Sequence, residues 1–228
     1  MENLEQHTYS ASLDCRYLLY VPDHIDDRTV LVLTLHGYSS NPRVMLHLTV
    51  ASTGPQHIVA ALEAPNQHYL TQGLPGAHSK IGYNWGVGEH WGSAVRLHHD
   101  MLMECLAALR GRFHIPASRC ALVGFSQPVG LNYRFAASHP SQVRGVIGIC
   151  GGVPRDWEED KYQSVTASIL HLAREEDEFY PPALSTQFAG RLRSRASDVE
   201  FHMLPGGHRF PSKAKGIVEP WMDRVFGV

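Results

Sequence analysis

The sequence predicts an α/β fold in which a mostly parallel central sheet is covered by helices on both faces. Short apolar segments rich in β-branched residues alternate along the chain with segments whose apolar residues recur at helical spacing. Continuous apolar strands that alternate with helices of about 10–15 residues are typical of such sheets. Because no linker, repeat or low-complexity tract interrupts the alternation, we expect residues 1–228 to form a single domain.

Seven segments have the composition of buried strands. They are residues 16–22, 29–37, 57–65, 120–126, 143–152, 167–175 and 199–207. Four further segments place their apolar residues on one helix face. They are residues 94–109, 131–136, 184–192 and 217–225, and Pro220 is expected to start or kink the last helix.

Residues 66–92 show neither pattern, and we expect a long irregular loop there. Long loops in compact domains are usually functional, and this one follows the end of a strand, where α/β sheets bind ligands. Trp85 and Trp91 lie in it. For Trp85 two interpretations stay open: it either packs the loop against the body of the protein or lines a substrate pocket. For Trp91 the packing role is favoured.

The composition excludes several classes of protein. A net charge of −2, with 43% hydrophobic and 18% charged residues, fits a globular protein without the basic surface that nucleic acids or anionic membranes require. No segment has the pattern of a signal peptide or is apolar for about 18 residues, so we expect a cytoplasmic protein without integral membrane contact. We also expect a monomer or homodimer. Three of the four cysteines have apolar neighbours, as free core thiols do.

The segment CALVGFSQPVG carries the strongest chemical signal, because a buried strand runs through Ser126 directly into a helix. A serine on such a sharp turn lifts its hydroxyl clear of the sheet, and the next amide, that of Gln127, faces a developing oxyanion. Pro128 replaces the glycine that usually ends G-x-S-x-G. Proline is tolerated in a first helical turn but restricts Gln127 before it. We expect Gly130 to provide the close contact between helix and sheet instead.

Three other motifs complete a hydrolytic site. The turn His36-Gly37-Tyr38 follows an early strand, where the Tyr38 amide would be a second oxyanion donor, and His36 is interpreted as structural. Asp177 lies just past a strand and four residues before a proline, although Glu175, Glu176 and Glu178 remain competitors. His208 follows a strand and two glycines. The order serine, acid, histidine is that of the α/β-hydrolase triad.

From about residue 16 onwards, the chain resembles the small carboxylesterase/phospholipase branch of the α/β-hydrolase family, which includes acyl-protein-thioesterase-like enzymes. The matching segments are LHGYSSNP, GFSQ, EEDEFYP and GGH, in that order. The resemblance implies hydrolysis of short- to medium-chain esters or acyl thioesters, no cofactor and no large lid domain.

We therefore predict a serine carboxylesterase that acts on a small-molecule ester, with Ser126, Asp177 and His208 as catalytic residues and Tyr38 and Gln127 as oxyanion donors. Trp85 and Phe179 are the predicted substrate-binding residues. An acyl-thioesterase or lysophospholipase activity, or a silent scaffold that only binds a small ligand, remains an alternative. No metal is expected, since the adjacent His98 and His99 point about 100° apart on a helix and no paired Cys/His spacing occurs.

Overall fold

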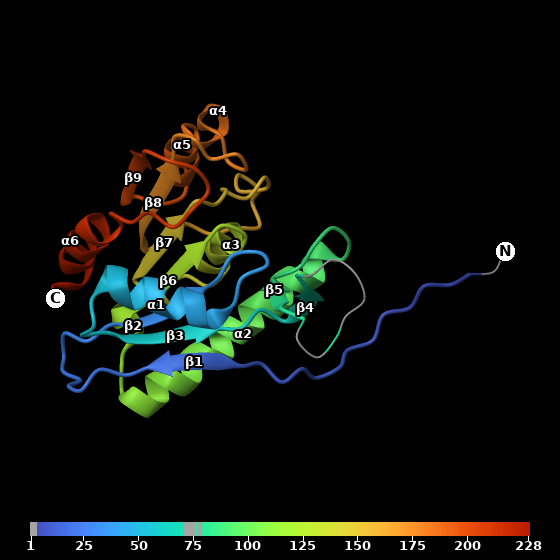
Figure 1. Cartoon of the computed structure of the whole chain (residues 1–228), viewed down its shortest axis with the longest axis horizontal. Helices are drawn as coiled ribbons and strands as arrows, with labels where there is room; N and C mark the ends of the chain where they lie inside the picture. Colours follow the sequence, from blue (N-terminus) through green and yellow to red (C-terminus); the bar gives the residue numbers. More distant parts are fainter. Residues whose placement is uncertain (1–3, 71–75, 77–78) are drawn as a thin grey trace.

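The computed structural model describes residues 4–70, 76 and 79–228, and it has a seven-stranded sheet at its centre (Figure 1). The strand order is β1-β3-β2-β6-β7-β8-β9, and only β1 runs antiparallel to its neighbour. The strands are β1 (Tyr17–Tyr20), β2 (Leu31–Leu35), β3 (Ile58–Leu62), β6 (Cys120–Phe125), β7 (Gly145–Ile149), β8 (Ser168–Arg174) and β9 (Val199–Leu204). Each predicted strand segment contains one of them, and the predicted fold class is confirmed.

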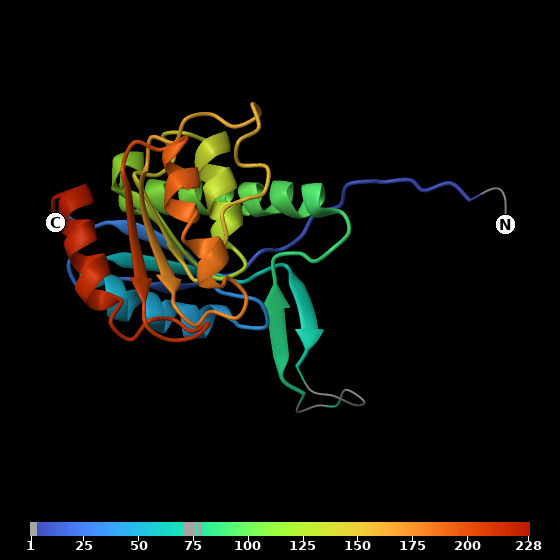
Figure 2. The same ribbon diagram turned by 90° about the horizontal axis from the view of Figure 1, so that it is seen from above.

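Helices cover both faces of the sheet (Figure 2). On one face α1 (Pro42–Thr53) packs against α6 (Lys215–Phe226), and the opposite face is covered by α2 (Trp91–Phe113), α3 (Val129–Ser138) and α5 (Phe188–Arg193). Two short helices, η1 (Ala117–Arg119) and α4 (Pro182–Ser185), lie in connections. The helix expected over 184–192 is thus divided between α4 and α5. Pro220 lies inside α6 and does not begin it.

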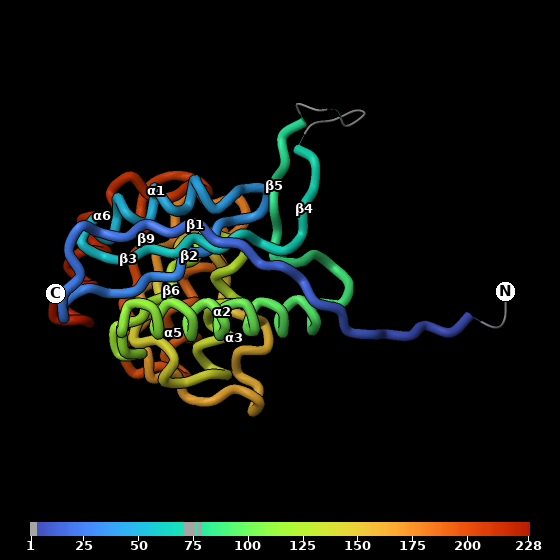
Figure 3. The backbone as a smooth tube through the Cα atoms, turned by 90° about the horizontal axis from the view of Figure 1, so that it is seen from below, coloured from blue at the N-terminus to red at the C-terminus, as the bar shows by residue number. Residues whose placement is uncertain are grey.

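The segment 66–92 is more ordered than the sequence indicates. Strands β4 (Asn66–Tyr69) and β5 (Ile81–Asn84) form an antiparallel hairpin that projects from the body, and α2 begins at Trp91 (Figures 2 and 3). The prediction of an irregular loop is therefore wrong for β4, for β5 and for the first residues of α2. β4 is short and mostly exposed, and the buried residues of β5 are Gly82 and Asn84, so neither strand carries an apolar signal. Residues 71–75 and 77–78 of this segment lie outside the described residues.

The parallel strands bring distant parts of the chain to one edge of the sheet. The carboxyl ends of β2, β6, β7, β8 and β9 all meet there, and Gly124 in β6 pairs with Gly148 in β7. Within the described part of the chain, no separate lid domain is inserted over this edge. No described helix has the length and apolar character needed to cross a membrane.

Candidate active site

Ser126 occupies the sharp turn between β6 and α3. Its φ angle is 63°, in the left-handed region that residues other than glycine rarely adopt. Two backbone hydrogen bonds hold it there, since its N–H donates to the Ile149 carbonyl at 2.8 Å and its carbonyl accepts from Val129 N–H at 3.2 Å. This strained conformation is the one that a nucleophile elbow requires. Pro128 is accommodated at the start of α3, with φ −76° and ψ −8°.

Glycines on the sheet side allow α3 to approach closely. A Cβ atom on Gly148 would lie 2.7 Å from Val129 Cγ1, and one on Gly151 would lie 2.7 Å from the Ser126 carbonyl oxygen. Gly130, by contrast, faces the Gly152 carbonyl in a loop. The expectation that Gly130 supplies the contact between helix and sheet is therefore wrong, because the sheet and the loop after β7 provide the space.

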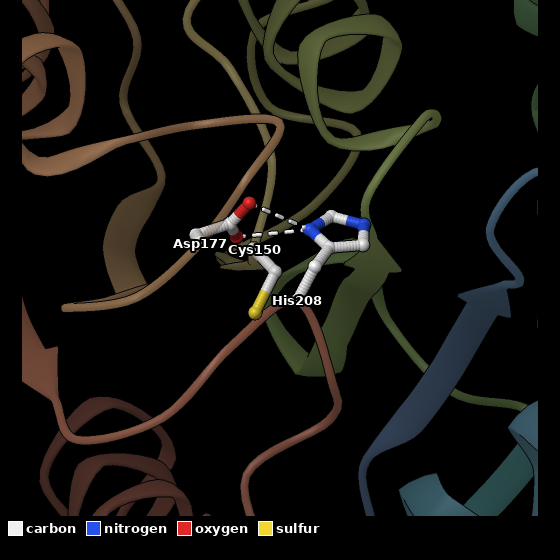
Figure 4. Close-up of side chains that lie close together, drawn as sticks. All are labelled: Cys150, Asp177 and His208. Atoms are coloured by element: carbon white, nitrogen blue, oxygen red, sulfur yellow. Dashed lines mark hydrogen bonds and ion pairs between the residues drawn. The ribbon is translucent and has the colours of Figure 1, made fainter.

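The structure brings Ser126, His208 and Asp177 into one chain of hydrogen bonds. Ser126 Oγ lies 2.8 Å from His208 Nε2, and His208 Nδ1 lies 3.0 and 2.9 Å from the two Asp177 oxygens (Figure 4). Because a carboxylate only accepts hydrogen bonds, Nδ1 carries the ring hydrogen. His208 Nε2 is then the acceptor for the serine hydroxyl, as a general base must be.

Asp177 is held more firmly than its acidic neighbours. Its side chain is buried, and Oδ1 accepts hydrogen bonds from the amides of Phe179 and Tyr180, both at 2.9 Å. Glu175, Glu176 and Glu178 are exposed. Glu178 accepts a hydrogen bond from the backbone N–H of His208 at 3.1 Å, so it contacts the turn and not the imidazole.

Aromatic side chains surround the imidazole. The rings of Phe179, Phe125 and Tyr180 have their centroids 4.8, 5.3 and 6.0 Å from that of His208. These contacts restrict the orientations that the imidazole can adopt. The His208 side chain is 11% exposed, and His208 lines the cavity beside Ser126.

Tyr38 and Gln127 both line the same cavity, and the backbone N–H of neither has a hydrogen-bond partner among the described residues. His36 is structural, as predicted by the HG turn. Its Nε2 accepts from Ala64 N–H at 3.2 Å, so its Nδ1 donates to the Gly37 carbonyl at 2.9 Å. The Gly37 carbonyl and the Tyr38 N–H belong to the same trans peptide unit. The Tyr38 N–H therefore points in the direction opposite to the Gly37 carbonyl, away from His36 Nδ1.

The cavity beside Ser126 has a volume of about 770 Å³. Its apolar wall beyond the nucleophile is formed by Leu131, Val153, Pro154, Leu184 and Phe188. Phe179 also lines the cavity, and its substrate-binding role stays a prediction. Trp85 does not line it, which contradicts the predicted substrate-binding role. Its side chain is 1% exposed, and its indole donates to the His36 carbonyl at 2.8 Å. Trp91, for which packing alone was favoured, does border the cavity.

A thiol lies next to the acid and the base. The ligand atoms of Cys150, Asp177 and His208 are within 4.8 Å of one another, a spacing that suits a metal ion (Figure 4). However, burial raises the pKa of the Cys150 thiol to about 12, and the protonated thiol donates to the Arg209 carbonyl at 3.4 Å. The Asp177 carboxylate already binds His208. Hydrogen bonds within the protein thus explain why these three side chains lie close together.

Sequence comparison assigns the chain to a family. Residues 92–222, more than half of the chain, match the model of the phospholipase/carboxylesterase family. The chain belongs to this family. Its members are hydrolases of carboxylic esters, and this chain is assigned to the same broad class. No curated protein sequence matches the chain significantly.

Several solved structures have the same fold as this chain. Esterase PE8 superposes with a TM-score of 0.73 at 20% identity and covers 93% of this chain and 100% of its own. A Bacillus cereus carboxylesterase has a TM-score of 0.71 at 15% identity, over 93% and 95% of the two chains. Arabidopsis thaliana SOBER1 has a TM-score of 0.68 at 16% identity, over 86% and 98%. At these identities the likeness establishes the α/β-hydrolase fold.

Proposed function

We propose that this family member is a serine carboxylesterase that hydrolyses short- to medium-chain esters through an acyl-enzyme on Ser126. The observation that carries the proposal is the unbroken chain of hydrogen bonds from Asp177 through His208 to Ser126. Ser126 lines a cavity together with Tyr38 and Gln127, whose backbone N–H groups have no partner among the described residues. The fold and the family alone do not require that arrangement.

The reaction has two halves. His208 Nε2 takes the hydroxyl proton as Ser126 Oγ attacks the ester carbonyl, and the amides of Tyr38 and Gln127 stabilise the oxyanion. The same proton passes from His208 to the departing alcohol, which leaves an acyl-serine. Water then attacks the acyl group, gives its proton to His208, and releases the acid as the proton returns to Ser126. Asp177 stabilises the imidazolium in both halves.

The cavity supports an apolar acyl group of limited length. The cavity of about 770 Å³ is bordered by aliphatic and aromatic side chains together with Arg134, Arg155 and Arg191, and it has room for a short or medium acyl chain. A thioester or a lysophospholipid would use the same machinery, because the pocket and not the triad decides between them. The cytoplasmic location, the absence of a cofactor and the monomeric or homodimeric state remain predictions.

Fluorophosphonate labelling combined with a panel of p-nitrophenyl esters tests the proposal. The wild-type protein should be labelled at Ser126, and its activity should peak at an acyl chain that fills the cavity. Ser126→Ala should lose both labelling and turnover, whereas Ser212→Ala, an exposed serine before α6, should keep both. A wild-type protein that neither reacts with the probe nor cleaves any ester would be the silent scaffold.

A further inference from the structure

One buried segment contacts both turns that carry the unpaired amides. We call this segment, residues 83–86, the brace. It comprises the last two residues of β5 and the two residues that follow, and it is hydrogen-bonded both to the turn that contains Tyr38 and to the elbow that contains Gln127. The two amides lie far apart along the chain, so the distance between them depends on whatever connects the two turns.

On the first side, the brace is bonded around Tyr38. The Trp85 indole N–H donates to the His36 carbonyl at 2.8 Å, two residues before Tyr38. Directly after Tyr38, the Ser39 N–H donates to the Tyr83 carbonyl at 3.0 Å. The turn that presents the Tyr38 amide is thus fixed before and after that residue.

On the second side, the brace is bonded to the Gln127 side chain. Gln127 Oε1 accepts from Trp85 N–H at 3.0 Å, and Gln127 Nε2 donates to the Gly86 carbonyl at 2.7 Å. Both ends of the side-chain amide are therefore used. Since the same residue carries the second unpaired backbone N–H, these two bonds fix the orientation of that donor relative to the brace.

Trp85 is the residue of the brace that reaches both sides. Its indole N–H bonds the Tyr38 turn, and its backbone N–H bonds Gln127. The ring is buried, with its centroid 5.6 Å from that of His36 and 5.5 Å from that of His98. Hydrogen bonds in such a dry environment are stronger and more rigid than exposed ones.

We propose that Trp85 is a positioning residue that sets the spacing between the Tyr38 and Gln127 amides. The inference rests on the proposed function, because it matters only if those amides bind an oxyanion. Trp85 touches no substrate in this arrangement. It acts through the His36 carbonyl and the Gln127 side chain, and its effect belongs to the transition state and not to substrate binding.

Trp85→Phe tests the proposal, since it keeps a buried aromatic ring but removes the indole donor. Loss of one oxyanion donor costs roughly 10²–10³ in kcat, so a displaced donor should cost at least about tenfold. KM for p-nitrophenyl butyrate should change by less than about twofold, since ground-state contacts are retained. Combining Trp85→Phe with Gln127→Met should lower kcat by less than the product of the single effects, because both changes loosen the same connection.

Trp157→Phe is the matched control. Trp157 is also fully buried, and its indole also donates to a carbonyl, that of Arg191, at 2.9 Å. The control should lose similar stability in urea unfolding but keep kcat. The inference is overturned if the two variants lower kcat equally, or if Trp85→Phe changes KM alone. If the wild-type protein has no esterase activity and no fluorophosphonate labelling, the proposed function fails and the inference fails with it.

Discussion

Asp177 illustrates how burial selects one acid from several. Four consecutive acidic residues, 175–178, follow β8, and the sequence alone leaves all of them open. In the structure only Asp177 is buried, and two backbone amides as well as the imidazole bind its carboxylate. An isolated buried carboxylate is unfavourable unless hydrogen bonds compensate for the lost hydration, and Asp177 has these bonds.

Asp177→Asn should lower kcat by on the order of 10³–10⁴ while the fold is retained, because the amide no longer favours the ring tautomer that accepts from Ser126. The measurement is steady-state hydrolysis of p-nitrophenyl butyrate, with circular dichroism as the check on folding. Glu176→Gln, at an exposed neighbouring position, should keep wild-type kcat. An Asp177→Asn variant within tenfold of the wild type would exclude this acid as the orienting residue.

The sequence predicts the chemistry at this scale better than it predicts the supporting contacts. Ser126, Asp177 and His208 are recognisable because each follows a strand end within a local motif. The role of Trp85 depends on a carbonyl 49 residues earlier and on a side chain 42 residues later. No local pattern encodes such bonds. An aromatic residue in a loop next to an expected site therefore looks the same whether it binds substrate or supports the backbone.

At the scale of elements, the contact between α3 and β7 depends on Gly148. A methyl group there would overlap the Tyr133 hydroxyl and lie 2.7 Å from Val129 Cγ1. Gly148→Ala should therefore lower the free energy of unfolding by about 1–3 kcal/mol, the usual cost of overpacking a core. Urea unfolding measures the change. Gly111→Ala, on α2 with no atom near the added methyl group, should not destabilise the protein; equal losses in both variants would contradict this explanation.

Helix α1 and the β4–β5 hairpin were not predicted from the sequence, and the physical reason is the same for both. Helix α1 buries Met45 together with the polar Thr49, Ser52 and Thr53, so its inner face lacks an apolar period. Thr49 is satisfied there by a 2.7 Å hydrogen bond to Thr34. The hairpin β4–β5 also lacks that period, because β4 is mostly exposed and the buried residues of β5 are Gly82 and Asn84. The seven strands of the main sheet were predictable because burial on both faces demands continuous apolar residues.

At the scale of the whole molecule, five buried histidines couple stability to pH. Burial lowers the pKa of His57 and His99 to about 4 and that of His98 and His171 to about 3, and it also lowers the pKa of His36. In the unfolded chain histidine has a pKa of about 6.5. The unfolded state therefore binds more protons as the pH falls below about 6.5, and the folded state is progressively disfavoured until the folded pKa values are reached.

The free energy of unfolding should fall between pH 6.5 and 4, with a slope for each such histidine that reaches at most about 1.4 kcal/mol per pH unit in the middle of that range. His98→Leu should reduce that slope by about the contribution of one group, whatever its effect on stability at pH 7. His47→Gln, at an exposed position on α1, should leave the slope unchanged. Urea unfolding at pH 7, 6, 5 and 4.5 provides the measurement. Because the readout is a slope, a repacking cost in the His98 variant does not obscure it, and an unchanged slope would show that proton uptake by this histidine does not accompany unfolding.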